Sequence, residues 1–400
     1  MHRCLRLILS CVILLPLLTG CWDRQELNEL GIMLGLGVDK DGDLIKVSAQ
    51  VVVPNEVSSK AAGGKGTPVT QYEASATTLF EAIQKLTETS PRRIFLAHIR
   101  VLVFGEEYAR KNGIYDVIEA LMREPTARPD YYVLVAKNTT ASQLLDVLTP
   151  LDNTPAEKMY NSLDISSTTW SPTTTVTGDE LLEFMISPGI QPVITGVEIL
   201  GPKGQSGNKE NISTIRSPAR LNTTGLSVFK KDKLIGWLTE DESKGYNYIR
   251  DNVESTVNHM PCRKQGNVTF KALRTTTKRK AEIVNDKPVI HIDVKNVSSI
   301  GAVECGIKIG SMKVLKELEA DSEERLIELM QNSVNAVKRK FHVDIFGFGQ
   351  EVYHADPKFF KKIENEWDKH FEELDIKYKT NVQIKRVGTL DDSFRNELKE

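Results

Sequence analysis

The sequence predicts an α+β protein of several domains, in which mixed and antiparallel sheets are packed by helices, preceded by a cleaved signal peptide. Three observations lead to this prediction. Apolar residues recur at strand spacing in some segments and at helical spacing in others. Turn pairs such as Asp41-Gly42 and Lys231-Asp232 separate neighbouring strand patterns. The 400 residues exceed what one hydrophobic core usually serves, so we expect two or three domains.

Residues 1–20 have the layout of a secretory signal peptide. Arg3 and Arg6 carry positive charge, residues 7–18 are apolar, and the chain turns charged and polar after Cys21. The apolar stretch is shorter than the roughly 20 residues that a membrane-spanning helix needs. We therefore expect it to be removed from the mature chain.

The end of this segment, Leu18-Thr19-Gly20-Cys21, resembles the bacterial lipobox. The resemblance implies cleavage after Gly20, with an S-diacylglycerol group and an N-acyl group on Cys21. Several acyl chains anchor a protein stably, whereas one chain gives only marginal binding. We expect a lipid-anchored protein on the extracytoplasmic face of a cell membrane.

Residues 21–200 are predicted to form an N-terminal α+β domain. Apolar spacing and capping residues predict its regular elements. The strands are two within 31–53 and one each at 93–105, 130–137 and 193–200. The helices are at 77–89, capped by Thr77 or Thr78, at about 106–123, at 140–148 and at 178–186. No regular element is predicted for the Thr- and Ser-rich stretch 153–177.

Residues 201–217 are rich in glycine and have no apolar periodicity, so they are predicted to be a linker. A strand-rich middle domain, residues 218–285, and a C-terminal α+β domain, residues 286–400, follow. The clearest helix is predicted at 322–340, where acidic residues stand near the start and basic residues at the end, as the helix dipole favours.

The composition excludes a nucleic-acid partner. The chain has 52 Lys and Arg residues against 54 Asp and Glu residues, and two of the basic residues leave with residues 1–20. No strong positive field remains to attract nucleic acid. Besides Cys21, the mature chain keeps only Cys262 and Cys305. We expect two buried thiols, with a disulfide as the alternative in an extracytoplasmic setting.

The sequence offers no catalytic, cofactor or metal signature. The turn at 39–43 lacks the EF-hand glycine and glutamate, and Gly35 and Gly37 lack the third glycine of a dinucleotide fingerprint. The histidines never stand at a zinc spacing. His98 lies in an apolar segment and is expected to be a core histidine rather than a base. We therefore expect no enzyme, no cofactor and no metal.

Stretches spread along the whole mature chain, taken as a set, resemble the GerAC-type family, the C-subunit lipoproteins of bacterial spore germinant receptors. They are CWDRQELNELGIMLGLGVDKD, PRRIFLAHIRVLVFGEEYARKNGI, LMREPTARPDYYVLVA, GLSVFKKDKLIGWLTEDESKGY and DIFGFGQEVYHADPKFFKKIENEWDKHF.

The resemblance implies a three-domain α+β protein on the outer leaflet of the spore inner membrane. It would assemble with integral-membrane A and B subunits into a receptor that responds to small nutrients and starts spore germination. The family names no catalytic residue, so only the lipidation of Cys21 carries over. For Arg123 and Arg128 of the MREPTAR motif we expect salt bridges within the first domain, with partner contact as the alternative.

Two other classes of protein are alternatives to a receptor subunit. One is a lipid-anchored extracytoplasmic solute-binding protein of a transporter, which usually has two similar doubly wound lobes. The clustered hairpins of this sequence argue against that fold. The other is an anchored cell-wall hydrolase, for which the sequence lacks a catalytic constellation.

Overall fold

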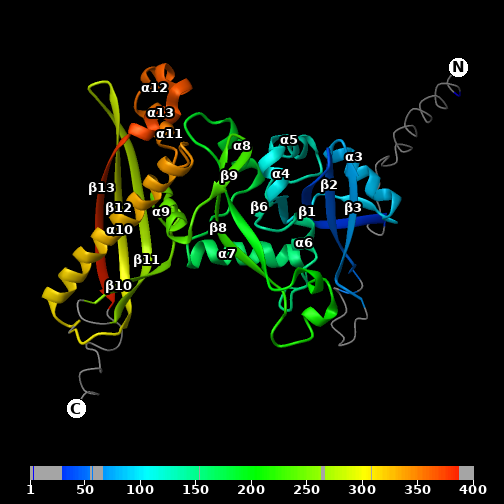
Figure 1. Cartoon of the computed structure of the whole chain (residues 1–400), viewed down its shortest axis with the longest axis horizontal. Helices are drawn as coiled ribbons and strands as arrows, with labels where there is room; N and C mark the ends of the chain where they lie inside the picture. Colours follow the sequence, from blue (N-terminus) through cyan, green and yellow to red (C-terminus); the bar gives the residue numbers. More distant parts are fainter. Residues whose placement is uncertain are drawn as a thin grey trace, which may run out of the picture.

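The computed structural model describes residue 3 and residues 29–54, 56, 66–152, 154–262, 266–307 and 309–386. Cys21 and most of the expected signal peptide lie outside them. The described strands form a nine-stranded sheet and a four-stranded sheet, which lie toward opposite ends of an elongated body (Figure 1). Both sheets are mixed and packed by helices, so the predicted α+β class is confirmed.

The strands of the first sheet are β1 (Leu30–Asp41), β2 (Leu44–Val52), β3 (Val69–Ala76), β4 (Arg93–Phe95), β5 (Val101–Gly105), β6 (Tyr132–Ala136), β7 (Val193–Leu200), β8 (Arg220–Lys230) and β9 (Lys233–Trp237). Their order is β3-β2-β1-β5-β6-β7-β8-β9, and β4 pairs with the start of β1. The central pairs from β1 to β7 are parallel, whereas β2, β3, β8 and β9 join antiparallel at the two sides.

Helices cover both faces of this sheet. They are α3 (Leu79–Lys85), α4 (Glu106–Lys111), α5 (Tyr115–Arg123) and α8 (Gly178–Ile186) on one face, and α6 (Ala141–Leu145) and α7 (Pro155–Thr169) on the other. Leu102 and Phe104 of β5 pack into the first core, and Val101 and Val103 into the second. A parallel strand buried on both faces reads as a continuous apolar run, which explains the apolar sequence of β5.

The second sheet has the order β10-β11-β12-β13, and β13 runs parallel to β12. Asn285 and Asp286 have positive φ angles of 50° and 58° in the β11–β12 turn, as a two-residue hairpin turn requires. Its strands and the helices on its inner face are β10 (Thr256–Pro261), β11 (Asn267–Val284), β12 (Lys287–Val303), β13 (Asp375–Arg386), α9 (Glu240–Arg250), α10 (Met312–Lys340), α11 (Phe348–Ala355), α12 (Pro357–Ile363) and α13 (Trp367–Glu373).

The two sheets meet in a shared core. Val193 and Leu226 of the first sheet pack in the same cluster as Ile290 of the second sheet and Val334 of α10. The main chain is joined as well, because the N–H of Gln191 donates to the carbonyl of Asp344 at 2.7 Å.

The strands β8 and β9, expected in a middle domain at 218–285, hydrogen-bond within the first sheet. The segment 201–217, expected to be a linker, contains the 3₁₀ helices η4 (Lys203–Gln205) and η5 (Lys209–Asn211). It buries Asn211, whose side-chain amide donates to the carbonyls of Leu148 and Ala219 at 2.8 and 3.0 Å. The segment 201–217 therefore connects β7 and β8, which pair in one sheet. The domain boundaries remain a prediction.

Cys262 and Cys305 form a disulfide with a Cα–Cα distance of 6.4 Å, so the prediction of two free thiols was wrong. The reason lies in the register, because Val268 of β11 stands opposite Met260 on one side and Val303 on the other. Each cysteine follows the end of one of these flanking strands by one or two residues. Forty-three residues of sequence separate them, which is why spacing alone did not pair them.

Several helix boundaries differ from the sequence-based expectation. The predicted helix at 106–123 is two helices, since Gly113 between them has a φ of 91°. The helix predicted at 322–340 begins ten residues earlier, as α10 after its N-cap Ser311. The helix α7 was missed, although Thr154 caps it and a proline occupies its first turn, both of which are start signals.

His98 is exposed, so its prediction as a core histidine was wrong. The expected strand at 93–105 is interrupted between β4 and β5, where the N–H of Ile99 closes a turn on the carbonyl of Leu96. The apolar residues of the turn point inward and the imidazole does not.

Candidate functional site

The glycines of strand β1 let helix α6 lie directly on the sheet. A Cβ atom on Gly35 would stand 2.6 Å from Cδ2 of Leu145, and one on Gly37 would stand 3.1 Å from Cδ1 of the same residue. The pattern that superficially suggests a nucleotide loop is therefore a packing surface for a helix.

Asp39, two residues after Gly37, caps α6 from the neighbouring strand. Its Oδ1 accepts the N–H of Ala141 and its Oδ2 that of Ser142, both at 2.9 Å. The side chain is 5% exposed, and burial raises the pKa of this carboxyl although the two N–H groups oppose the shift. A Cβ on Gly105 would lie 2.1 Å from Oδ1 of Asp39, so any side chain at this position would displace the carboxylate that caps α6.

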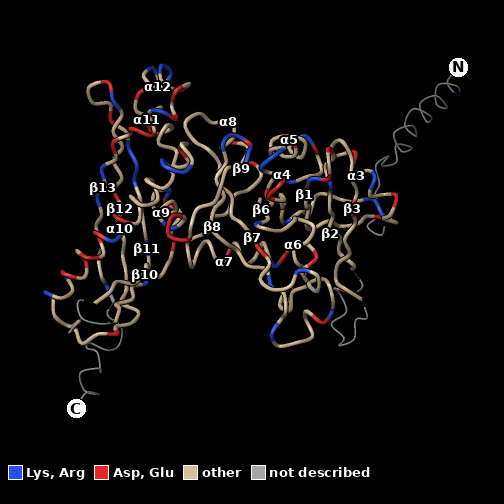
Figure 2. The backbone as a smooth tube through the Cα atoms, in the orientation of Figure 1, with Lys and Arg blue, Asp and Glu red and all other residues tan. Residues whose placement is uncertain are grey.

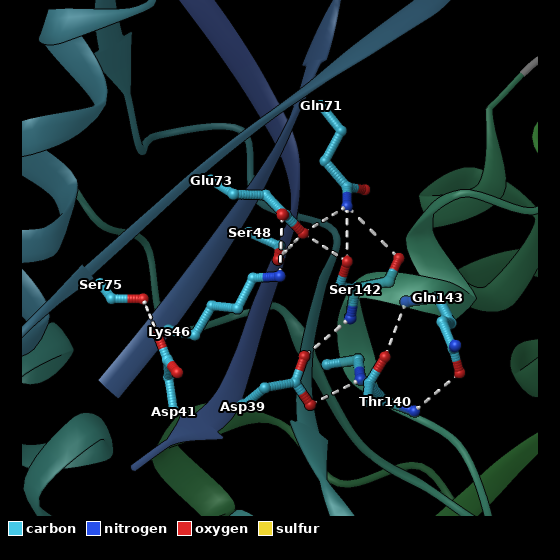
Figure 3. A network of polar contacts seen from close by, with 11 residues as sticks. Asp39, Asp41, Lys46, Ser48, Gln71, Glu73, Ser75, Thr140, Ser142 and Gln143 are labelled. Atoms are coloured by element: carbon cyan, nitrogen blue, oxygen red, sulfur yellow. Dashed lines mark hydrogen bonds and ion pairs between the residues drawn. The ribbon is translucent and has the colours of Figure 1, made fainter. Parts of the chain in front are cut away.

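Glu73 of β3 continues the network on the outer side of Ser142 (Figure 3). Its Oε1 accepts from the hydroxyls of Ser48, at 3.1 Å, and Ser142, and its Oε2 pairs with Lys46 at 2.8 Å. Burial alone would raise the pKa of Glu73, but the bonds from Lys46 and the two hydroxyls lower it overall. The carboxylate is therefore held in its charged form.

The groups of this network line an open cleft of about 500 Å³. Both oxygens of Asp39 and both of Glu73 already accept hydrogen bonds from this chain. These bonds tie the carboxylates to the strands and the helix that surround them. In the described part of the chain no group of three or more acidic, His or Cys residues is placed to hold a metal ion. The network is a polar joint between β1–β3 and α6.

A second buried carboxylate, Asp344, organises the turn between α10 and α11. Its Oδ1 accepts the N–H groups of Phe346 and Gly347, at 2.8 and 3.0 Å, and its Oδ2 accepts the N–H of Gly349, at 2.8 Å, and Nε1 of Trp367, at 3.0 Å. Burial raises its pKa to about 6 against the lowering effect of these four donors. The sequence DIFGFGQ thus forms one closed turn around its own aspartate.

Two arginines from separate elements meet at the same turn. Arg250 of α9 and Arg279 of β11 each donate to the carbonyl of Phe346 at 3.1 Å, and Arg279 also pairs with Glu351 at 3.4 Å. Burial and the nearby Arg250 lower the pKa of Arg279. The turn therefore fixes α9, α11 and β11 against one another.

The residues singled out from the sequence fall in different places. Cys21 lies outside the described residues. Arg123 pairs with Glu119, and Arg128 pairs with Asp130 at 3.3 Å, so the expected salt bridges within the first domain are confirmed. Among the described helices none is both long enough and apolar enough to span a bilayer. The sequence reading missed the roles of Asp39 and Asp344, whose only signal was an acidic residue beside glycines.

Comparison with known families adds to this geometry. The model for the spore germination protein N-terminal domain matches residues 23–199. The model described as spore germination B3/GerAC like, C-terminal, matches residues 224–388. The protein is thus a two-part spore germination protein. It belongs to the GerAC-type family, as the sequence resemblance implied.

Curated relatives match over nearly their full length. The chain is 28% identical to spore germination protein KC of Bacillus subtilis (strain 168), with 98% of each chain covered. It is 23% identical to spore germination protein B3 of the same organism, with 93% of this chain and 95% of that protein covered. The crystal structure of the GerBC protein has a TM-score of 0.56 at 20% identity, covering 88% of this chain and 96% of that one. At that identity the likeness shows a common fold.

Proposed function

We propose that this protein is the lipid-anchored, noncatalytic C subunit of a nutrient germinant receptor, required for spore germination in response to small nutrients. The observation that carries the proposal is the match of both halves of the chain to the GerAC-type family. The names of the relatives, all spore germination proteins, support the same role.

The lipid anchor is supported by the sequence Leu-Thr-Gly-Cys that ends at Cys21. Cleavage after Gly20 would leave residues 22–28 between the lipidated cysteine and residue 29, where the described body begins. Seven extended residues span at most roughly 25 Å. The body would therefore stay close to the outer leaflet of the spore inner membrane, beside the integral-membrane A and B subunits that we propose as partners.

A noncatalytic role is consistent with the structural use of three acids. Buried Asp39 and Asp344 and exposed Glu73 each accept hydrogen bonds or an ion pair from groups of this chain. These bonds hold neighbouring elements of the fold together.

The alternative, a solute-binding protein of a transporter, receives less support. That class usually has two similar doubly wound lobes, whereas the strands described here form one sheet of nine and one of four, in different orders. We therefore retain the receptor subunit as the proposed function.

Deletion of the gene in the source organism tests the proposal. Deletion should slow germination triggered by particular nutrients and leave viability and nutrient-independent germination unchanged. Normal germination with every nutrient tried would contradict the proposed role. Reintroduction of the wild-type gene should restore the response.

A further inference from the structure

The outer face of the four-stranded sheet is uncovered and basic. Ile290, Ile292 and Val294 of β12 point into the core, so the side chains between them point outward. The register aligns outward residues across three strands, with Lys280 of β11 and Lys377 of β13 on either side of His291. Because no helix of the described chain lies among these outward side chains, this face is open to a partner.

The outward positions of β11, β12 and β13 carry eight basic and three acidic side chains, and this set is called the basic face below. Its basic members, all exposed, are Lys271, Arg274, Lys278 and Lys280 of β11, Lys287 and Lys295 of β12, and Lys377 and Lys379 of β13. Within the described part of the chain, none of these eight residues forms an ion pair. Figure 2 shows the same recurrence of basic residues along these strands.

This concentration of charge is unusual for the chain that carries it. The whole chain has a formal net charge of −2, whereas the basic face has an excess of five positive charges. Across the strands, Asp293 stands between Lys278 and Lys379, and His291 stands between Lys280 and Lys377. One carboxylate thus faces four lysines, which leaves most of their positive charge without a partner of this chain. The arrangement fits an extended polyanion.

The make-up of the face favours a bilayer over a protein as that polyanion. Seven of the eight basic residues are lysines, and no Phe, Tyr or Trp occupies an outward position of β11–β13. Protein interfaces are enriched in aromatic residues and arginine and depleted in lysine. A flat array of lysines is suited to diffuse attraction by anionic headgroups, to which each lysine near the surface adds.

We propose that the basic face rests on an anionic phospholipid surface. The proposal rests on the proposed membrane anchoring, which brings the body within reach of a bilayer. Contact at the basic face would turn the opposite, helix-covered side of the second sheet away from the bilayer and leave it free for the receptor partners.

The test uses the full, lipidated chain incorporated into vesicles of phosphatidylcholine, with or without phosphatidylglycerol. Lysine acylation followed by mass spectrometry reports the accessibility of each amino group. In anionic vesicles, labelling of Lys278, Lys280, Lys377 and Lys379 should fall about five-fold and recover at high salt, because salt screens the attraction. The exposed lysines at 361, 362 and 369, on α12 and α13, serve as controls and should label equally in both vesicles.

A matched pair of variants sharpens the result. Replacing the four lysines with glutamine (K278Q, K280Q, K377Q and K379Q) should abolish the protection of Lys295. Replacing the three control lysines in the same way should leave that protection unchanged. Both sets are exposed, so neither should unfold the chain.

The outcomes separate the two proposals. If the chain binds both vesicles but the basic face is labelled equally in each, the bilayer contact is overturned and the anchoring stands. If the chain stays in solution with both, both proposals are overturned. Protection that is the same in neutral and anionic vesicles would also overturn an electrostatic contact with lipid.

Discussion

The carboxylate of Glu323 on α10 accepts the backbone N–H of Val382 on β13 at 2.9 Å. One turn earlier on the same helix, Glu319 accepts the N–H of Ile384 at 2.9 Å. The strand β13 is an edge strand, and free N–H groups at an edge are a template for unwanted pairing. Two glutamates one helical turn apart on α10 thus accept backbone N–H groups at the edge of the second sheet.

Removing both acids (E319A with E323A) should expose this edge. The amides of Val382 and Ile384 should exchange with solvent about ten-fold faster or more, because each loses a hydrogen bond to a charged group, worth about 1.5 kcal/mol or more. Hydrogen exchange followed by mass spectrometry measures this. Glu324 is exposed, so Glu324→Ala is the control and should leave both amides unchanged. Equal exchange in all three proteins would contradict the role of α10 at the edge.

The cap that Asp39 places on α6 can be tested in the same manner. Asp39→Ala should lower the free energy of unfolding by about 2–3 kcal/mol, since two buried N–H groups lose their acceptor. Asp41 is exposed and bonds only Ser75 in the network, so Asp41→Ala should cost less than about 0.5 kcal/mol. Urea unfolding monitored by circular dichroism compares them. Similar losses in the two variants would argue against the cap.

The disulfide closes a stretch of 43 residues around β11 and β12. Reduction should destabilise the protein by about 4 kcal/mol on the chain-entropy account, seen as a lower melting temperature with reductant. The double variant Cys262→Ser with Cys305→Ser should melt at the reduced value and ignore the reductant. A melting temperature that does not respond to reductant in the wild type would contradict this assignment.

Asp344 gives the stability a specific pH dependence. Its folded pKa is about 6, above the unfolded value of 3.8, so the native state binds its proton more readily than the unfolded state does. The stability from this proton is fully present below about pH 4 and is lost as the pH rises through about 6, an effect on the order of 2–3 kcal/mol.

Unfolding free energies at several pH values, compared between wild type and Asp344→Asn, isolate this contribution from other titrating groups. The variant should be less stable overall, because an amide offers one acceptor to four donors. The difference between the two proteins should shrink as the pH rises from 4 to 7. A difference that does not vary with pH would disprove the assigned shift.

The lipid anchor gives the last prediction. Cys21→Ala should leave the folded body intact and release it from the membrane, lowering germination with it. Cys11→Ala, within the apolar run, should keep normal membrane retention. Immunoblots of membrane and soluble fractions measure both. Membrane retention of the Cys21 variant would refute the anchoring argument.

Local sequence signals were enough for the elements whose caps and turns are local. Thr78 caps α3 and the turn at Asp41-Gly42 joins β1 to β2, both as expected. Tertiary contacts decided the rest. In the first turns of α10, Leu318 packs in the same cluster as the disulfide. Because this contact joins segments far apart in the sequence, the local sequence pattern did not predict the helix there.

The candidate sites were predictable only in part. Asp39 and Asp344 owe their roles to N–H groups that fold around them, about one hundred residues away for Asp39 and within five residues for Asp344. The pairing of Cys262 with Cys305 depends on the register of β11 between two strands. The basic face depends on the alignment of β12 with β13, a strand that arrives after the whole helical segment.

The most direct test of the central claim is the intact mass and membrane fractionation of the native protein from spores, with its co-purifying chains identified. We expect a diacylated amino terminus at Cys21, recovery with the membrane, and two multispanning partners. An unmodified chain that is soluble or has no membrane partner would contradict the receptor subunit and favour a binding lipoprotein or another role.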